Sequence, residues 1–321
     1  MVDAEPQPGV DYPRNWHEFV DWFPDDDACL SYLERLRWGG GYLCRFCGQA
    51  GAGSWPVRRG LRRCSVCRSE SSVTAGTIFP GSRLPLTSWF AAIWYVVNQK
   101  QGVSALGRKR VLGLGSYQTA WTWLHKLRRA MVIPGRELLF GPVEVDETLI
   151  GTRRSGTFGR GDVRKALVAI AVEHRVGGRP GGVRMRRIPN ASTDVLSDVV
   201  VHQVEPGAEV QTDAWNGYNH RSLPGFLHHV VNLAASGDPA HAAMPQVHRV
   251  ASLRKRWLLG THQGAISHSH LDYDLDEFTF RFNRRGSRHR GLLFSRLIEG
   301  ALLTAPKPYS GLIAPRDVSA A

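Results

Sequence analysis

Two CxxC pairs constrain the fold of this chain more than any other feature. The first is Cys44-Arg-Phe-Cys47, the second is Cys64-Ser-Val-Cys67, and sixteen residues separate them. Each pair predicts a tight turn that points two thiolates at one metal ion, and two such turns complete a tetrahedron of four sulfurs. A thioredoxin-like redox pair would instead be a single CxxC within a βαβ pattern. The spacing therefore predicts a structural Zn²⁺ site in a small ribbon of short strands.

The fifth cysteine, Cys29, follows a different pattern. It lies at helical spacing with Leu30, Leu33 and Leu36, so we expect a small buried thiol. Paired CxxC cysteines with one isolated cysteine fit a reducing compartment better than a disulfide framework. The acidic N-terminus lacks the apolar core of a signal peptide, and the longest apolar run, 89–97, is too short to span a bilayer. We expect a cytoplasmic, nucleoid-associated protein with no membrane partner.

The charge of the chain is strongly positive and unevenly distributed. The 321 residues have a formal net charge of +13. Residues 1–34 contain nine acidic side chains and one base, whereas residues 35–131 contain sixteen Lys or Arg and one acid. Such a basic stretch indicates a polyanionic partner, and double-stranded DNA is favoured over a membrane surface. The hydrophobic content of 42% indicates packed cores, and the length suits two or three folding units.

Changes in composition divide the chain into five segments. They are an N-terminal helical segment (1–38), the zinc ribbon (39–82), a helical DNA-binding domain (83–134), an α/β domain (135–305) and a tail (306–321). The N-terminal segment is expected to form one or two short helices, with Asp25 or Asp26 capping the second helix.

The helical domain resembles a helix-turn-helix. Residues 102–106 and 116–131 flank a break at the glycines of 113–115, and Ser116 is a predicted N-cap. The second helix would present its early turns to base edges and its end to phosphates. Leu124 and Leu127 would turn inwards, and the predicted DNA-facing residues are Gln118, Thr119, Thr122, His125, Lys126, Arg128 and Arg129. The alternative is an ordinary helical hairpin that links two domains.

The α/β domain has the element order of a ribonuclease H-like fold. The run 165–172 is almost wholly apolar, as expected of a buried central strand. Its predicted elements are strands at 142–150, 165–172 and 183–188, a helix at 192–203, a short strand at 208–212 and a helix at 246–259. The order β-β-β-α-β-α therefore predicts an α/β catalytic domain of the ribonuclease H type after the ribbon and the helices.

Two carboxylates occupy the positions that a ribonuclease H-like nuclease requires. Asp146 lies in the first strand, in Val143-Glu-Val-Asp-Glu-Thr148, and Asp213 follows the short fourth strand. Two Mg²⁺ ions about 4 Å apart would activate the attacking oxygen and stabilise the leaving one. By parity Glu147 points to the opposite side of the strand, whereas Glu144 shares the face of Asp146 and is the alternative ligand. A single carboxylate at a strand end would be an ordinary turn former, but the pair is more specific.

The layout resembles that of bacterial insertion-sequence transposases of the DDE class with an N-terminal zinc ribbon. The resemblance covers nearly the whole chain, through the ribbon, the helical domain and the two carboxylate motifs. Two long blocks strengthen it, Ser252-Leu-Arg-Lys-Arg-Trp-Leu-Leu-Gly-Thr-His262 and Asp276-Glu-Phe-Thr-Phe-Arg-Phe-Asn-Arg-Arg285. It implies Mg²⁺-dependent cleavage at transposon ends, with Mn²⁺ as a substitute, and transfer of the freed 3′-OH into target DNA by a homodimer or higher oligomer.

The resemblance also implies a third metal ligand. In such enzymes this ligand precedes a helical lysine by seven residues, which is two turns along the same face. Lys255 matches the lysine and would contact DNA phosphate, so His248 stands where most DDE enzymes have Glu. His248 would bind the metal through a ring nitrogen or orient a ligand or water. Near the end of the last block, Arg281, Arg284 and Arg285 are expected along the DNA, unless they form a solvated basic face.

Two other functions fit the same residues. A DNA-binding regulator would use the ribbon and the helices beside an inactive ribonuclease H-like remnant. A nuclease or resolvase of the same fold would cut DNA without joining it. A Mg²⁺-dependent strand-transfer assay on end-sequence DNA separates the three functions.

Overall fold

The chain folds into two compact units, each built around its own core. The computed structural model describes residues 5–51, 53–58, 60–80, 84–133, 135–151, 165–218, 223–232, 240–262 and 268–314. Unit 1 comprises residues 1–134 and 286–312, and unit 2 comprises residues 135–285 and 313–321. Pro134, the predicted boundary, and the last residues of the predicted tail lie outside the described part of the chain.

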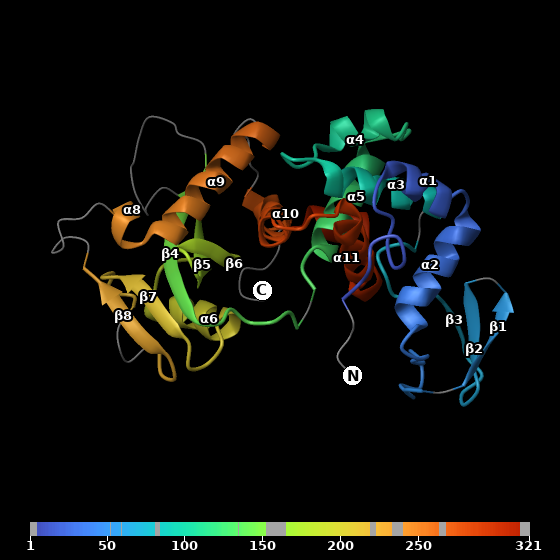
Figure 1. Cartoon of the computed structure of the whole chain (residues 1–321), viewed down its shortest axis with the longest axis horizontal. Helices are drawn as coiled ribbons and strands as arrows, with labels where there is room; N and C mark the ends of the chain where they lie inside the picture. Colours follow the sequence, from blue (N-terminus) through green and yellow to red (C-terminus); the bar gives the residue numbers. More distant parts are fainter. Residues whose placement is uncertain are drawn as a thin grey trace. The chain divides into compact units, whose positions relative to one another are not determined.

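Unit 1 combines a small sheet with a set of helices (Figure 1). Asp25 accepts a hydrogen bond from the Ala28 N–H, 2.8 Å, and Ser116 accepts one from the Thr119 N–H, 3.0 Å, so two of the predicted helix caps are confirmed. The three strands form an antiparallel sheet of order β1-β2-β3. The elements are α1 (Trp16–Trp22), α2 (Asp26–Trp38), β1 (Ser54–Arg58), β2 (Leu61–Cys64), β3 (Glu70–Ser72), α3 (Leu86–Asn98), α4 (Ala105–Val111), α5 (Tyr117–Ala130) and α11 (Arg290–Leu303); α12 (Tyr309–Ile313) follows.

Five aromatic rings form the centre of unit 1. Phe294 of α11 contacts the rings of Phe19, Phe23, Phe90 and Trp94, with centroids 5.5–5.7 Å apart. Aromatic pairs at such distances add stability beyond the area that they bury. Residues 286–312 therefore belong to unit 1, although the sequence analysis placed them up to residue 305 in the α/β domain. The reason is a set of long-range contacts that no local pattern of α11 specifies.

Unit 2 contains a mixed five-stranded sheet of order β6-β5-β4-β7-β8. Its central strand, β4, pairs with β5 in antiparallel and with β7 in parallel orientation. The four strands expected from the sequence are present, and a fifth strand, β8, forms an exposed edge that the sequence analysis did not anticipate. The strands are β4 (Pro142–Ile150), β5 (Ala166–Arg175), β6 (Arg179–Ile188), β7 (Glu209–Asp213) and β8 (Leu227–Val231).

Helices cover both faces of this sheet (Figure 1). Alternate residues of β5 face opposite sides: Ala169 and Ala171 pack with α6, whereas Val168, Ile170 and Val172 pack with α9 and α10. This alternation is the expected period of two for a strand buried on both faces. The helices are α6 (Thr193–Gln203), α8 (Ala240–Ala243), α9 (Pro245–His262) and α10 (Leu271–Asn283), with a short 3₁₀ turn, η1 (His268–His270), before α10. The α/β class and the ribonuclease H-like order are confirmed.

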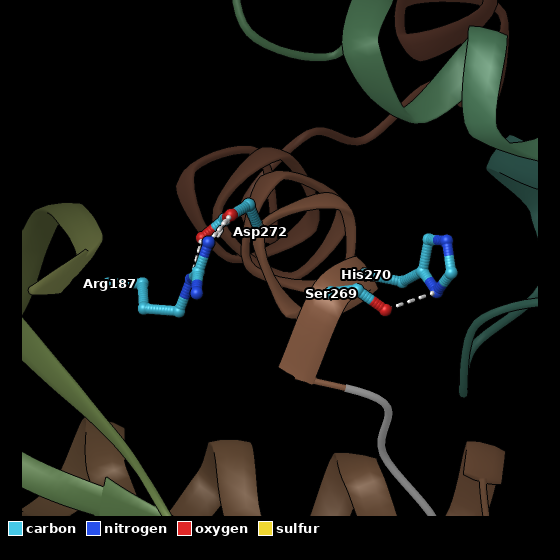
Figure 2. A network of polar contacts seen from close by, with 4 residues as sticks. All are labelled: Arg187, Ser269, His270 and Asp272. Atoms are coloured by element: carbon cyan, nitrogen blue, oxygen red, sulfur yellow. Dashed lines mark hydrogen bonds and ion pairs between the residues drawn. The ribbon is translucent and has the colours of Figure 1, made fainter. Parts of the chain in front are cut away.

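Helix α10, for which the sequence predicted no element, contains the Phe-Thr-Phe-Arg-Phe sequence. Phe278, Phe280 and Phe282 are all buried, and a helix buried on most of its surface shows no clear polar face in its sequence. At its first turn, the Asp272 carboxylate accepts hydrogen bonds from Arg187 of β6, with N–O distances of 3.0–3.2 Å. Figure 2 shows this pair on one side of the helix, with Ser269 and His270 pointing away from it. Within the described residues, no helix is long and apolar enough to cross a membrane.

Candidate functional site

The four CxxC cysteines come together in the ribbon of unit 1. Their sulfurs all lie within 4.8 Å of one another, with 3.6 Å between Cys44 and Cys67 and 3.9 Å between Cys47 and Cys64. A tetrahedron with Zn–S bonds of about 2.3 Å requires sulfurs about 3.8 Å apart, so the spacing suits Zn²⁺. Among the described residues, this is the one group of three or more His, Cys, Asp or Glu ligand atoms that meets the 4.8 Å limit. The predicted structural zinc site is supported by its geometry.

The two CxxC turns have matching backbone geometry. The Gly48 N–H donates to the Cys44 carbonyl and the Arg68 N–H donates to the Cys64 carbonyl, at 2.9 and 3.1 Å. Gly48 and Arg68 both adopt left-handed conformations, with φ of 69° and 63°. Hydrogen bonds from the backbone N–H groups of Cys47 and Phe46 lower the pKa of the Cys44 thiol to about 6. The turn therefore favours the thiolate form of Cys44, whereas burial and hydrogen bonds with the neighbouring cysteine sulfurs raise the pKa of Cys47 to about 11.

The predicted recognition helix is α5. Gln118 is exposed, and Thr119, Thr122, Lys126 and Arg129 are half-buried, whereas Leu124 and Leu127 are fully inside. The Lys126 ammonium lies 5.9 Å from the centroid of the Trp89 ring, and burial lowers the pKa of this lysine. The side chains that remain accessible follow one face of the helix.

Two predicted DNA-facing residues of α5 are buried instead. His125 is 3% exposed and Arg128 is 2% exposed, because both positions turn towards the interior of unit 1. A buried guanidinium cannot contact a phosphate in this conformation, so Arg128 does not belong to the DNA-facing surface.

The two predicted catalytic aspartates lie side by side in unit 2. β4 and β7 are parallel neighbours, and their register pairs Glu144 with Gln211 and Val145 with Thr212. Asp146 and Asp213 are the next residues along the two strands. Each has one carboxylate oxygen fixed by a backbone N–H: Asp146 Oδ1 by Glu147 at 2.7 Å, and Asp213 Oδ1 by Trp215 at 3.1 Å.

A buried tyrosine shows how much negative charge gathers at these strand ends. Tyr218 donates a hydrogen bond from its hydroxyl to Glu147 Oε2, 3.2 Å. Burial raises the pKa of Tyr218 well above its usual value, and the carboxylates of Glu147, Asp146 and Asp213 raise it further. Glu147, which accepts this bond, lies on the opposite side of β4 from Asp146. The carboxylates of Asp146 and Asp213, on adjacent strands, are oxygen donors of the kind that Mg²⁺ prefers.

Glu144, the alternative ligand, is fully buried and engaged within the protein. Its Oε2 accepts the Val247 N–H at 2.7 Å, and its Oε1 lies 2.7 Å from His174 Nε2. Sequence reasoning recognised that Glu144 and Asp146 share a face, but it missed both partners. The only sign in the sequence that Glu144 has a role was its spacing, two residues before Asp146 on the same strand.

His248 and Lys255 lie on α9, which packs on the same side of the sheet as Glu144. His248 follows Val247 in the first turns of the helix and is half-buried, whereas Lys255 is exposed. The ligand atoms of Asp146, Asp213 and His248 are not among the described groups that gather within 4.8 Å. The structure thus places His248 directly after Val247, whose N–H binds Glu144, and Asp146 and Asp213 on the adjacent strands β4 and β7.

The three arginines near the end of the last sequence block have partners within unit 2. The Arg281 guanidinium forms an ion pair with Glu277, 2.8 Å. Arg284 lies over the Phe280 ring, 4.2 Å from its centroid. Arg285 donates to the carbonyls of Phe282, Gly181 and Pro180, and thereby joins the end of α10 to β6.

Comparison with known proteins agrees with this arrangement. Residues 138–283 match the ISXO2-like transposase domain, and residues 24–70 match the transposase zinc-ribbon domain. An uncharacterized protein in transposable element ISH50 of Halobacterium salinarum is 24% identical over 283 residues, which cover 82% of this chain and 92% of that protein. The two matched segments coincide with the four-cysteine site and with the sheet that contains Asp146 and Asp213. The chain therefore belongs to the insertion-sequence transposases that join a zinc ribbon to an ISXO2-like DDE transposase domain.

Proposed function

We propose that this transposase cuts DNA at the ends of its element and joins those ends to target DNA. Water would attack the phosphorus at the element end, the P–O3′ bond would break, and the element would keep a 3′-OH. That oxygen would then attack a phosphorus of the target and displace a target 3′-oxygen. The number of phosphodiester bonds is conserved in the second step, so no external energy source is needed.

The observation that carries this proposal is the position of Asp146 and Asp213 on adjacent parallel strands, each directly after the last paired residues, Val145 and Thr212. Their carboxylates would hold Mg²⁺, with Mn²⁺ as a substitute. Bound there, the metal supplies the Lewis acidity that activates an attacking oxygen and stabilises a leaving one. Since a backbone N–H fixes one oxygen of each aspartate, the two carboxylates are oriented before any ligand binds.

We assign the other residues of the site by their places on α9. His248 would complete the ligand set or orient a water molecule through a ring nitrogen. Lys255 lies seven residues later, two turns along the helix, and its exposed ammonium would contact a DNA phosphate. Arg284, with its ring contact, would add a second phosphate contact.

We place DNA reading in unit 1. α4 and α5 form a helical pair with a short turn at 112–116, which suits a helix-turn-helix. Gln118, Thr119 and Thr122 would reach base edges, and Lys126 and Arg129 would contact phosphates. A homodimer or higher oligomer would hold two element ends at once.

The experiment is a cleavage and strand-transfer assay on DNA with element-end sequences. Asp146→Asn and Asp213→Asn keep the side-chain shape but remove a charge, so each is expected to abolish both steps with Mg²⁺. DNA affinity measured by gel shift should change by no more than about twofold, because binding depends mainly on phosphate contacts elsewhere. Cleavage by Asp146→Asn at the wild-type rate would exclude the metal-ion reaction, and binding without any cleavage by the wild type would favour a regulator.

A further inference from the structure

Two rows of side chains cross from β4 to β7 on the face covered by α9. In-register residues of neighbouring strands point to the same side of a sheet, as do residues two apart on one strand. Glu144 and Gln211 are paired in register and form the first row. Asp146 and Asp213, two residues further along each strand, form the second row. The second row contains the proposed metal ligands, so the first row lies directly behind the reaction site.

Both members of the first row hold the segment that leads to His248. Glu144 Oε2 accepts the Val247 N–H at 2.7 Å, and Gln211 Nε2 donates to the Ala243 carbonyl at 3.0 Å. Val247 is the residue before His248. The connection from α8 to α9 is therefore tied to β4 through one bond and to β7 through the other.

The Glu144 bond acts as a helix cap. The first N–H groups of a helix have no partner within the helix, and a carboxylate at that end also interacts well with the helix dipole. α9 begins at Pro245, so the Val247 N–H is one of these groups. Its acceptor comes from β4, 103 residues earlier in the chain. A cap on the sheet fixes where the helix begins relative to the sheet.

Further contacts hold the cap in place. His174 of β5 lies 2.7 Å from the second oxygen of Glu144, and the Glu144 side chain is 0% exposed. Gln246, the neighbour of Val247, donates to the Gly178 carbonyl in the β5–β6 turn at 3.1 Å. The first turn of α9 therefore has polar anchors on β4 and on the β5–β6 turn, while Gln211 of β7 anchors the residue two before Pro245.

We propose that Glu144 and Gln211 are positioning residues that fix the first turn of α9, and hence His248, relative to Asp146 and Asp213. This inference rests on the proposed function for its catalytic consequence. Glu144 does not serve as a metal ligand; it acts through the Val247 N–H. Two acids thus lie two residues apart on β4 and have different roles: Glu144 anchors α9, and Asp146 binds the proposed metal.

The test compares two substitutions of Glu144 at saturating DNA and Mg²⁺. Glu144→Gln keeps an oxygen that can accept the Val247 N–H, and its cleavage rate should stay within about fivefold of the wild type. Glu144→Leu fills the volume without an acceptor, and should lower the rate about 100-fold, because a shift of about 1 Å at a catalytic group has that effect. DNA affinity should be unchanged in both. A metal ligand would behave differently, since Glu144→Gln would then be as inactive as Asp146→Asn.

Hydrogen exchange supplies a readout that is independent of activity. In the zinc-loaded protein without Mg²⁺, the Val247 amide should exchange at least about tenfold faster in Glu144→Leu than in the wild type, and at the wild-type rate in Glu144→Gln. The strands β4 and β5 should keep their protection, whereas a general loss of structure would expose them too. Glu209→Leu is the matched control, because Glu209 also faces a histidine, His229 at 3.5 Å, but is exposed and caps no helix.

Each outcome decides between the alternatives. Wild-type cleavage and Val247 exchange in Glu144→Leu would overturn the inference, as would an inactive Glu144→Gln. If Glu144→Leu does not fold, Gln211→Leu is the second variant, with an expected loss of about tenfold in rate and faster exchange near Ala243. If Asp146→Asn remains active, the proposed function fails, but the exchange experiment still tests how α9 is anchored.

Discussion

Removal of α11 is expected to unfold unit 1, even though this helix follows unit 2 in the sequence. Five large apolar side chains of α11 are at most 8% exposed: Leu293, Phe294, Leu297, Ile298 and Leu302. Burial of each contributes about 1.5–3 kcal/mol, or about 8–15 kcal/mol for the five together. The stability of a whole domain is about 5–15 kcal/mol. A fragment of residues 1–134 therefore loses about as much free energy as the entire unit is expected to have.

The experiment compares this fragment with one in which residues 1–134 are joined to residues 286–314 by a flexible Gly/Ser linker. Both are prepared with zinc. The joined fragment should show near-ultraviolet circular dichroism from its packed tryptophans, a cooperative thermal transition and salt-sensitive DNA binding. The short fragment should lack the first two and bind DNA without sequence preference. A cooperative transition at the same temperature in both fragments would refute the assignment of α11 to the core of unit 1.

Three further predictions concern unit 1. Chelation should remove about one zinc per chain and make the four ribbon cysteines reactive at pH 8, while Cys29 stays protected because burial raises its pKa to about 12; labelling of all five in protein that is otherwise folded would contradict this. Arg68→Gly should raise the free energy of unfolding, measured by denaturant titration, by up to about 1 kcal/mol. The substitution removes the strain of a left-handed non-glycine residue, and this gain is partly offset by loss of the cation–π contact with Trp55. Gly48→Arg, at the matching left-handed position, should lower the same free energy. Gly300→Ala should lower that free energy by about 1–3 kcal/mol, because its Cβ would lie 2.0 Å from the Ala130 carbonyl oxygen; Gly286→Ala, with open space around it, is the control, and equal thermal midpoints would count against this packing.

The sequence predicted those elements whose burial pattern is local and regular. β4 and β5 were found because apolar residues alternate or run continuously along them, and α5 because its cap and apolar spacing agree. β8 was missed because most of its residues are exposed at the edge of the sheet. α10 was not predicted, because Phe278, Phe280 and Phe282 are all buried, which removes the helical period. Elements whose burial leaves a regular local pattern are predictable, whereas an exposed edge strand and a helix buried on most of its surface leave no such pattern.

The candidate site divides in the same way. The pairing of Asp146 with Asp213 follows from strand order, and the cysteine cluster follows from spacing alone. The role of Glu144 could not be predicted, because its partner is a backbone N–H far along the chain. Arg128 was misplaced by about one position around α5, since cationic side chains near a helix end look exposed in sequence whether or not tertiary contacts bury them.

The return of the chain to unit 1 after residue 285 has a consequence for the order of synthesis. Domains usually fold as they leave the ribosome, with the N-terminal one first. Here the sheet of unit 2 is complete once α10 has emerged, whereas unit 1 must wait for α11. A polypeptide interrupted between residues 285 and 290 would contain every strand of the proposed nuclease but could not close the aromatic core of unit 1. If unit 1 reads the DNA sequence as we propose, a chain must be translated almost to its end before it can recognise its sites.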